Sequence, residues 1–415
     1  MEFKSTRGIL HKTLEDALVG GLASDGGLFV PSEFPVFSVS DFDGLENFPD
    51  MARRMLVPFF EGTSLEGHLE SIVNSALNFE IPVRDLGEFQ ILDLTKGPTN
   101  AFKDIGARFL ARCLSHIEGT KTILVATSGD TGSAVASAFH NVPNTEVVIL
   151  FPRGKISEIQ EKQLTCWDKN ILSLRVDGDF DDCQRLVKEI FKSEHNFSSA
   201  NSINVGRLLP QSTYYAYSSL TYFRKFAKAP DYIIPTGNMG NALACIWAKK
   251  MGLPIGRIFM ATNANRPIPD YFASHRYDPR KSIKTLANAM DVGAPSNMER
   301  FLDLIDTLDL EEYGAISVTD NQIQESIRDV REEYGEIICP HTATAYYAST
   351  QLNWEHPIIV ATADPSKFKE IVEKEIGESI KFPAQLAELL SKENRVIDIS
   401  ASKQEVLAKY KEWVH

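Results

Sequence analysis

The stretch Thr122-Ile123-Leu124-Val125-Ala126-Thr127-Ser128-Gly129-Asp130-Thr131-Gly132 decides the fold class of this chain. A continuous apolar run, 122–126, is followed by a glycine-containing loop and then by a segment of small residues. This order predicts a strand buried on both faces, leading into a helix that packs closely against it. The loop exposes several backbone N–H groups toward one point, which suits a carboxylate or a phosphate. A tight strand-to-helix connection, with Asp130 or Thr131 as the N-cap, explains the same residues equally well.

The same order of strand, loop and helix recurs along the chain. We expect further strands at the apolar runs 146–151, 171–176, 232–234, 258–261 and 358–361. Residues 179–192 have apolar side chains at helical spacing. Buried strands joined by helices predict an α/β fold with mainly parallel sheets, in which ligands bind at the carboxyl ends of the strands.

The chain divides into a small N-terminal domain and two α/β lobes. The first 88 residues are irregular, with helical periodicity at 51–60 and 65–77. We expect an N-terminal domain at 1–88, a first lobe at 89–235 and a second lobe at 236–415, with the two lobes interleaved in sequence. The less regular segment 265–321 is expected to be an insertion in the second lobe.

Composition excludes several classes of function. The chain has 415 residues, of which 43% are hydrophobic and 24% are charged, as in ordinary globular proteins. Its formal net charge of -13 argues against nucleic acid as a partner, because phosphate backbones bind basic surfaces. A few local lysines and arginines can still bind a small anionic substrate within an acidic protein.

The cysteines and the absence of apolar spans indicate a cytoplasmic protein. The five cysteines contain no CxxC pair, so we expect buried free thiols in a reducing compartment, without a disulfide framework or a metal site. The first residues lack the apolar core of a signal peptide. No run approaches the roughly 20 apolar residues that a membrane span needs.

Lys103 is a candidate nucleophile in the segment Gly97-Pro98-Thr99-Asn100-Ala101-Phe102-Lys103-Asp104. It stands where a loop enters an expected helix with an apolar face. Burial and the positive end of the helix both disfavour an ammonium, which favours the neutral amine that can attack an aldehyde. Most lysines instead extend the amine to solvent, and the local sequence leaves that alternative open.

Three further loops carry groups suited to an anion. Gly237-Asn238-Met239-Gly240-Asn241 combines two glycines with two amides, but it lacks the G-x-G-x-x-G spacing of dinucleotide-binding loops. Pro152-Arg153-Gly154-Lys155-Ile156-Ser157 places two cations after the strand 146–151. Asn201-Ser202-Ile203-Asn204-Val205-Gly206-Arg207 adds an amide, a hydroxyl and a guanidinium. Taken alone, the glycine loop is not specific, and the other two segments are better explained as solvated basic loops.

Together, these segments resemble the threonine synthase family in order and spacing, and within it the long bacterial and fungal form. The resemblance covers nearly the whole chain, and the segments that carry it are Thr6-Arg7-Gly8, 21–28, 97–104, 127–132, 152–157, 288–293, 340–343 and 362–368. It implies fold type II of the pyridoxal-phosphate enzymes, which has two open α/β lobes with the cofactor between them, here with a small N-terminal domain.

The resemblance also implies roles for individual residues. Lys103 would carry pyridoxal 5'-phosphate as a Schiff base and later move protons of the substrate. The cofactor phosphate would be held by Gly237, Asn238, Met239, Gly240 and Asn241, and the pyridine nitrogen would face Thr362. The substrate carboxylate would be bound by Ser128, Gly129, Asp130 and Thr131, and the substrate phosphate by Asn201, Ser202, Arg207 and Lys155. We expect no metal ion at the site.

The implied reaction converts O-phospho-L-homoserine and water to L-threonine and phosphate by elimination and hydration, the last step of threonine biosynthesis. The enzyme would act as a monomer or homodimer. The main alternative is a related phospho-lyase that releases a keto acid, ammonia and phosphate. An inactive homologue is disfavoured, because Lys103, Asn238 and Thr362 are present.

The chain departs from the family pattern at three positions. Asn100 stands where leucine is common, and Met239 where an aromatic residue or leucine is common. We expect both to be packing changes. Asp364 stands where histidine is common, close to Thr362, and could alter the local charge. His341 is expected to be a wall residue or a core histidine.

Overall fold

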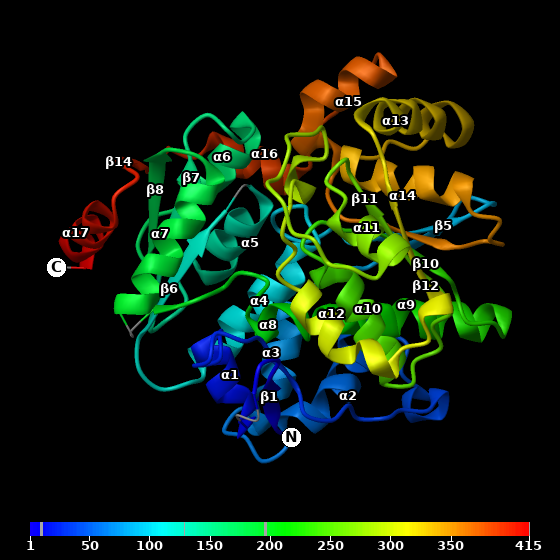
Figure 1. The fold of residues 1–415 in the computed structure, drawn as a ribbon, viewed down its shortest axis with the longest axis horizontal. Helices are drawn as coiled ribbons and strands as arrows, with labels where there is room; N and C mark the ends of the chain where they lie inside the picture. Colours follow the sequence, from blue (N-terminus) through cyan, green and yellow to red (C-terminus); the bar gives the residue numbers. More distant parts are fainter. Residues whose placement is uncertain (9–10, 128, 195–196, 415) are drawn as a thin grey trace.

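The computed structural model describes residues 1–8, 11–127, 129–194 and 197–414. They form two open α/β lobes above a small N-terminal domain (Figure 1). That domain contains β1 (Phe3–Ser5), β2 (His11–Lys12), β3 (Phe29–Pro31), α1 (Leu14–Gly20), α2 (Phe48–Phe60) and α3 (Leu69–Ala76). Asn47 caps α2 by accepting a hydrogen bond from the Asp50 amide. Because α2 packs against α9 (Gln211–Phe226) and α3 packs against α4 (Lys103–Ser115), the domain supports the base of both lobes.

The first lobe contains a five-stranded sheet that is parallel throughout. Its strand order is β14 (Ile397–Ser400), β8 (Ile171–Asp177), β7 (Thr145–Pro152), β6 (Lys121–Ala126) and β9 (Phe197–Ser198). Its helices are α5 (Asp130–Phe139), α6 (Glu158–Thr165), α7 (Phe180–Ser193) and α17 (Lys403–Val414). A Cβ at Gly132 of α5 would lie 2.4 Å from Thr127 Cγ2, which explains the small residues after the loop.

The second lobe contains a six-stranded sheet. Its order is β12 (Tyr313–Ser317), β11 (Ile258–Thr262), β10 (Tyr232–Pro235), β13 (Ile358–Ala361), β5 (Gln90–Asp93) and β4 (Val83–Asp85). Only the β4–β5 pair of this sheet is antiparallel. The remaining α-helices are α8 (Val205–Leu208), α10 (Gly240–Lys250), α11 (Pro267–Ser274), α12 (Met298–Leu304), α13 (Asp320–Tyr334), α14 (Pro340–Gln351), α15 (Lys369–Ile376) and α16 (Ala384–Ser391).

The strands of the two sheets do not follow the linear ranges 89–235 and 236–415. β5 belongs to the sheet of the second lobe, where it pairs with β13, and β14 joins the sheet of the first lobe beside β8. The expected insertion 265–321 supplies an edge strand, β12, to the second sheet. Apolar runs identify strands, but pairing between parallel strands depends on crossovers, which sequence periodicity does not encode.

The lobes and the N-terminal domain share a continuous apolar core that includes Phe3, Phe59, Phe109, Tyr214 and Trp247. All five cysteines are buried with free thiols, as expected. Among the helices of the described residues, none combines the length and the apolar character that crossing a membrane requires.

Candidate active site

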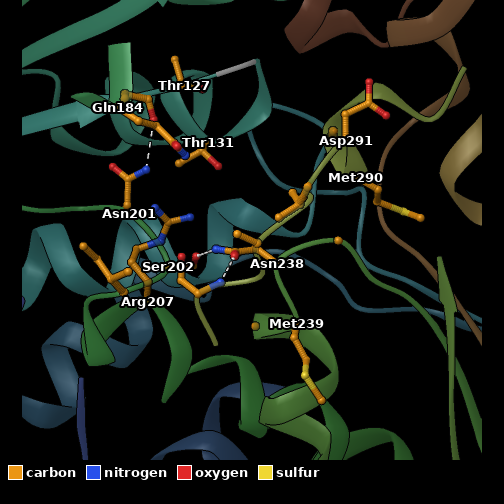
Figure 2. A pocket seen from close by; sticks show the side chains of 18 of the residues that line it. Thr127, Thr131, Gln184, Asn201, Ser202, Arg207, Asn238, Met239, Met290 and Asp291 are labelled. Atoms are coloured by element: carbon orange, nitrogen blue, oxygen red, sulfur yellow. Dashed lines mark hydrogen bonds between the residues drawn. The ribbon is translucent and has the colours of Figure 1, made fainter. Parts of the chain in front are cut away.

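A cavity of about 800 Å³ lies at the carboxyl ends of β6, β10 and β13. Its wall includes Thr127 after β6, Thr236 after β10 and Thr362 after β13, so both sheets contribute to it. The N-terminal domain adds Arg7 and Leu28 at the same cavity. Figure 2 shows polar side chains from separate elements arranged around this space. Ligands of open α/β sheets bind at such an edge, so the cavity is the candidate active site.

Lys103 lines this cavity at the first turn of α4. Its loop is attached to the end of β13, because the Phe102 amide donates to the Thr362 carbonyl (2.9 Å). Within the loop, the amide and the hydroxyl of Thr99 both donate to the Asp104 carboxylate, each at 2.8 Å. A Cβ at Gly97 would lie 2.4 Å from Asp104 Oδ2, so glycine is needed for this approach. The amine is therefore presented by a rigid turn.

Burial lowers the pKa of the Lys103 amine to about 8, because desolvation disfavours the ammonium. The negative charge of Asp130 opposes this shift, whereas the positive charges of Lys367 and Arg207 add to it. At pH 7 an amine with this pKa is neutral in about a tenth of the molecules, against fewer than about one in a thousand for an ordinary lysine. The site therefore favours the nucleophilic form of Lys103.

The loop Gly237 to Asn241 connects β10 to α10 and lines the cavity. A Cβ at Gly237 would lie 2.7 Å from Met290 Cα, so the loop passes close to a neighbouring backbone. Asn238 donates from Nδ2 to the Ser202 hydroxyl and accepts at Oδ1 from the Ser296 amide at 2.6 Å. Asn241 accepts at Oδ1 from the Tyr215 hydroxyl (2.8 Å), and its buried Nδ2 has no partner among the described residues. This free donor requires an acceptor that a bound molecule can supply.

Met239 has a left-handed backbone conformation, with φ of 62°, at the start of α10. Its side chain is fully buried in the core, and Figure 2 shows it directed away from Asn238 and Ser202. This placement is consistent with the packing role expected for Met239. The first amides of α10 then face the cavity side of the loop, where an anion is favoured.

Asn201, Ser202 and Arg207 form a second polar wall beside this loop (Figure 2). Asn201 donates to the Ala126 carbonyl at 3.0 Å, and its buried Oδ1 has no partner in the described part of the chain. Arg207 is 2% exposed, donates to the Ala200 carbonyl, and has a buried Nε without an acceptor among those residues. Burial lowers the pKa of Arg207 to about 10, although Asp104 opposes the shift. A buried guanidinium of this kind suits a bound phosphate.

The start of α5 forms the third wall. Gly129 has a φ of 142°, and its amide donates to Thr127 Oγ1 at 3.0 Å. Asp130 and Thr131 line the cavity, whereas Gly129 is not among the lining residues. Ser128, expected at the substrate carboxylate, lies outside the described residues. Thr127, which sequence patterns did not single out, therefore organises this turn by accepting hydrogen bonds from two amides.

Thr362 lines the cavity and is 5% exposed. Nearby, the carboxylate of Asp364 accepts hydrogen bonds from the amide (2.9 Å) and the hydroxyl (2.6 Å) of Ser366. Asp364 thus caps the 3-10 helix η6 (Pro365–Phe368), and this contact explains the departure from histidine. His341 is a cavity wall residue whose Nε2 accepts a hydrogen bond from the Ala289 amide at 3.1 Å.

The structure does not bring Lys155 to the cavity, because it is exposed on the turn between β7 and α6. Another lysine, Lys367, is fully buried close to the cavity without lining it, and it pairs with Asp130. Its segment, 362–368, belongs to the motif noted in the sequence. Its burial had no local signal, because a lysine in a loop ordinarily reaches solvent.

Comparisons with known proteins agree with this geometry. The family described as "Pyridoxal-phosphate dependent enzyme" matches residues 89–357, "Threonine synthase N terminus" matches 2–77, and "Threonine synthase, C-terminal" matches 341–410. Threonine synthase of Escherichia coli (strain K12) is 41% identical over 393 residues, which cover 90% of each chain. The crystal structure of threonine synthase from Escherichia coli superposes with a TM-score of 0.93 at 37% identity, covering 100% of both chains. Threonine synthase from Brucella melitensis, solved with PLP bound, gives a TM-score of 0.92 at 31% identity over 99% of each chain.

Fold, cavity and comparisons define a pyridoxal-phosphate-dependent enzyme of fold type II, which acts as a lyase. Within this class, three consecutive family matches and relatives that are 33–41% identical over most of the chain distinguish one group. The chain belongs to the threonine synthase family.

Proposed function

We propose that this chain converts O-phospho-L-homoserine and water to L-threonine and inorganic phosphate, with Lys103 bonded to the cofactor. The observation that carries the proposal is the cavity itself. It combines an amine of lowered pKa, Lys103, with a buried guanidinium, Arg207, that forms no salt bridge among the described residues. An amino-acid substrate with a phosphate on its side chain needs both groups.

The residues present fit pyridoxal phosphate. The Gly237 to Asn241 loop and the N-terminus of α10 would hold the phosphate of the cofactor, and the orphaned Nδ2 of Asn241 supplies a further donor. Lys103 would bond to the aldehyde carbon, and the neutral hydroxyl of Thr362 would face the pyridine nitrogen. When bound, the cofactor withdraws electrons from the amino acid and makes the protons on Cα and Cβ removable.

Lys103 is the proposed proton carrier. With the substrate amine bonded to the cofactor, Nζ of Lys103 would be free to carry protons one at a time. It would take one from Cα and pass it on before it takes one from Cβ, and it would later return protons to Cγ, which phosphate has left, and to Cα. Asn201, Ser202 and Arg207 hold the substrate phosphate, which leaves from Cγ before water adds at Cβ. Thr131 and the amides at the start of α5 orient the substrate carboxylate. The cavity has lining residues from both lobes and the N-terminal domain, so approach of the lobes would exclude stray water.

Two finer points belong to the proposal. Five buried free thiols support action in the cytoplasm, where thiols stay reduced. We also propose that the enzyme acts as a monomer or a homodimer.

The test is a product analysis of the purified enzyme with O-phospho-L-homoserine. We expect equal amounts of phosphate and L-threonine. A keto acid and ammonia in place of threonine would instead identify the phospho-lyase activity.

Lys103→Ala is the matching variant. It is expected to lose both the visible absorbance of the bound cofactor and at least about 1,000-fold in turnover, because no other group would carry the protons. Near-normal turnover by this variant would refute the assignment of Lys103.

A further inference from the structure

A buried ion pair stands behind the cavity wall that carries Asp130. Lys367 Nζ lies 2.7 Å from Asp130 Oδ1, and the two side chains are 0% and 2% exposed. Lys367 also donates to the Thr99 carbonyl at 3.0 Å, in the loop that presents Lys103. The pair therefore connects three segments, which are the start of α5, the Lys103 loop and η6.

Such a pair costs desolvation on both sides, and buried pairs of this kind are not needed for stability alone. Asp130 faces the cavity, whereas Lys367 is not among its lining residues. The described residues thus contain a carboxylate at the reaction space whose counterion is held away from that space. Stability of the fold alone does not explain this buried pair.

The charges around Lys103 supply an explanation. The groups that act on it come from four segments, namely Asp130 of α5, Lys367 of η6, Arg207 of α8 and Cys339 before α14. Asp130 in turn is influenced by Lys367, Lys103 and His341. Burial raises the pKa of the Cys339 thiol and lowers the pKa of His341 to about 3, so both are neutral near pH 7. Among the described residues, Lys367 and Lys103 remain as the cations that act on Asp130.

Asp130 itself stays ionised. Burial alone raises the pKa of its carboxyl, but the charges of Lys367 and Lys103 and the hydrogen bond from Lys367 hold the pKa well below its ordinary value. If Lys367 were neutral, Lys103 would be the remaining cation acting on this carboxylate among the described residues. An amine paired with a buried carboxylate stays protonated and can neither attack an aldehyde nor accept a proton.

We propose that Lys367 is a positioning residue that serves as the dedicated counterion of Asp130 and so keeps the Lys103 amine out of an ion pair. The inference rests on the proposed role of Lys103 at the cofactor. It assigns opposite effects to the two partners, since Asp130 favours and Lys367 disfavours a positive charge on the Lys103 nitrogen. An ion pair too far from Lys103 to act on it would show no such opposition.

The test is a pH titration of the visible absorbance band of the holoenzyme, which follows protonation of the nitrogen that Lys103 shares with the cofactor. The variants are Lys367→Met, Asp130→Asn and the double variant, all close in shape to the original side chains. Lys369→Met is the control, because Lys369 pairs with Glu373 and bonds the Ile380 carbonyl away from the cavity.

We expect Lys367→Met to raise the midpoint by about 1 pH unit and Asp130→Asn to lower it by about as much, as a single nearby charge does. The double variant should titrate between the two, and Lys369→Met as wild type. Equal midpoints in all variants, or shifts of the same sign in the two single variants, would overturn the proposal.

The proposal can still be tested if one variant fails to fold. If Lys367→Met does not fold, the comparison of Asp130→Asn with the double variant still isolates Lys367, and identical midpoints would count against its role. A wild-type protein without the band, or a band that persists in Lys103→Ala, would instead refute the assignment of Lys103. The two failures are therefore distinguishable.

Discussion

Replacing Arg207 by methionine should separate substrate binding from folding. The guanidinium is 2% exposed and forms no salt bridge among the described residues, so burial of its charge lowers the free energy of unfolding. Burial lowers its pKa from 12.5 to about 10, a difference that corresponds to on the order of 3 kcal/mol. Because the folded pKa lies below the ordinary one, this cost applies at every pH below about 10, including the assay pH.

Methionine removes that cost but also removes the charge-assisted hydrogen bond to the Ala200 carbonyl, worth about 1.5–3 kcal/mol. We therefore expect Arg207→Met to unfold at a temperature no lower than wild type, with a net gain in free energy of unfolding of up to about 1.5 kcal/mol. The substrate phosphate loses a charge-assisted contact of about 1.5–3 kcal/mol, so kcat/KM should fall about 10- to 150-fold.

The assay measures phosphate release against O-phospho-L-homoserine concentration, together with thermal unfolding of the same samples. Arg224→Met is the matched control, because Arg224 also donates to backbone carbonyls, those of Leu45 (2.7 Å) and Phe42 (2.6 Å), but lies outside the cavity. It should lose stability and keep wild-type kcat/KM. The reasoning is refuted if Arg207→Met keeps wild-type kcat/KM, or if it unfolds well below wild type while Arg224→Met does not.

Two further predictions concern the amine and the glycine loop. Because Lys103 must be neutral to accept a proton and burial lowers its pKa to about 8, kcat should rise with pH below about 8 and level off above it. A kcat that kept rising through pH 10 in a pH-rate profile would contradict the lowered pKa. Gly237→Ala should weaken cofactor binding about 10-fold, since the new Cβ would lie 2.7 Å from Met290 Cα and would force backbone to move. Cofactor titration followed by absorbance checks this, with Gly67→Ala as control because no atom lies within 4 Å of its added Cβ; equal affinities in the two variants would exclude the steric account.

The class of fold and the main parts of the site could be predicted from the sequence. Apolar runs such as 122–126 and 232–234 become strands, because a strand buried on both faces must be apolar along its length. Glycine loops after those runs become cavity walls, because the carboxyl ends of parallel strands meet at one edge. The resemblance to threonine synthases then located Lys103, Asn238 and Arg207, all of which line the cavity.

Other features could not be predicted, because they depend on contacts between distant segments. Lys155 and Lys367 each lie a few residues after a strand, yet Lys155 is exposed and Lys367 is fully buried against Asp130. Only the packing of η6 onto the start of α5 distinguishes them. The same holds for β5 and β14, since each strand pairs within a sheet whose other members lie far away in the sequence.

By itself, the sequence determined which residue types follow each strand, and therefore which groups the fold can present to an anion and an aldehyde. The tertiary structure alone decided the charge state of those groups. The pKa of Lys103 falls to about 8 because burial removes water and the charges of Lys367 and Arg207 add to the shift. Asp130 stays ionised, despite its burial, because the charges of Lys367 and Lys103 act on it. Desolvation and charge pairing act through space, and neither is encoded in the spacing of residues along the chain.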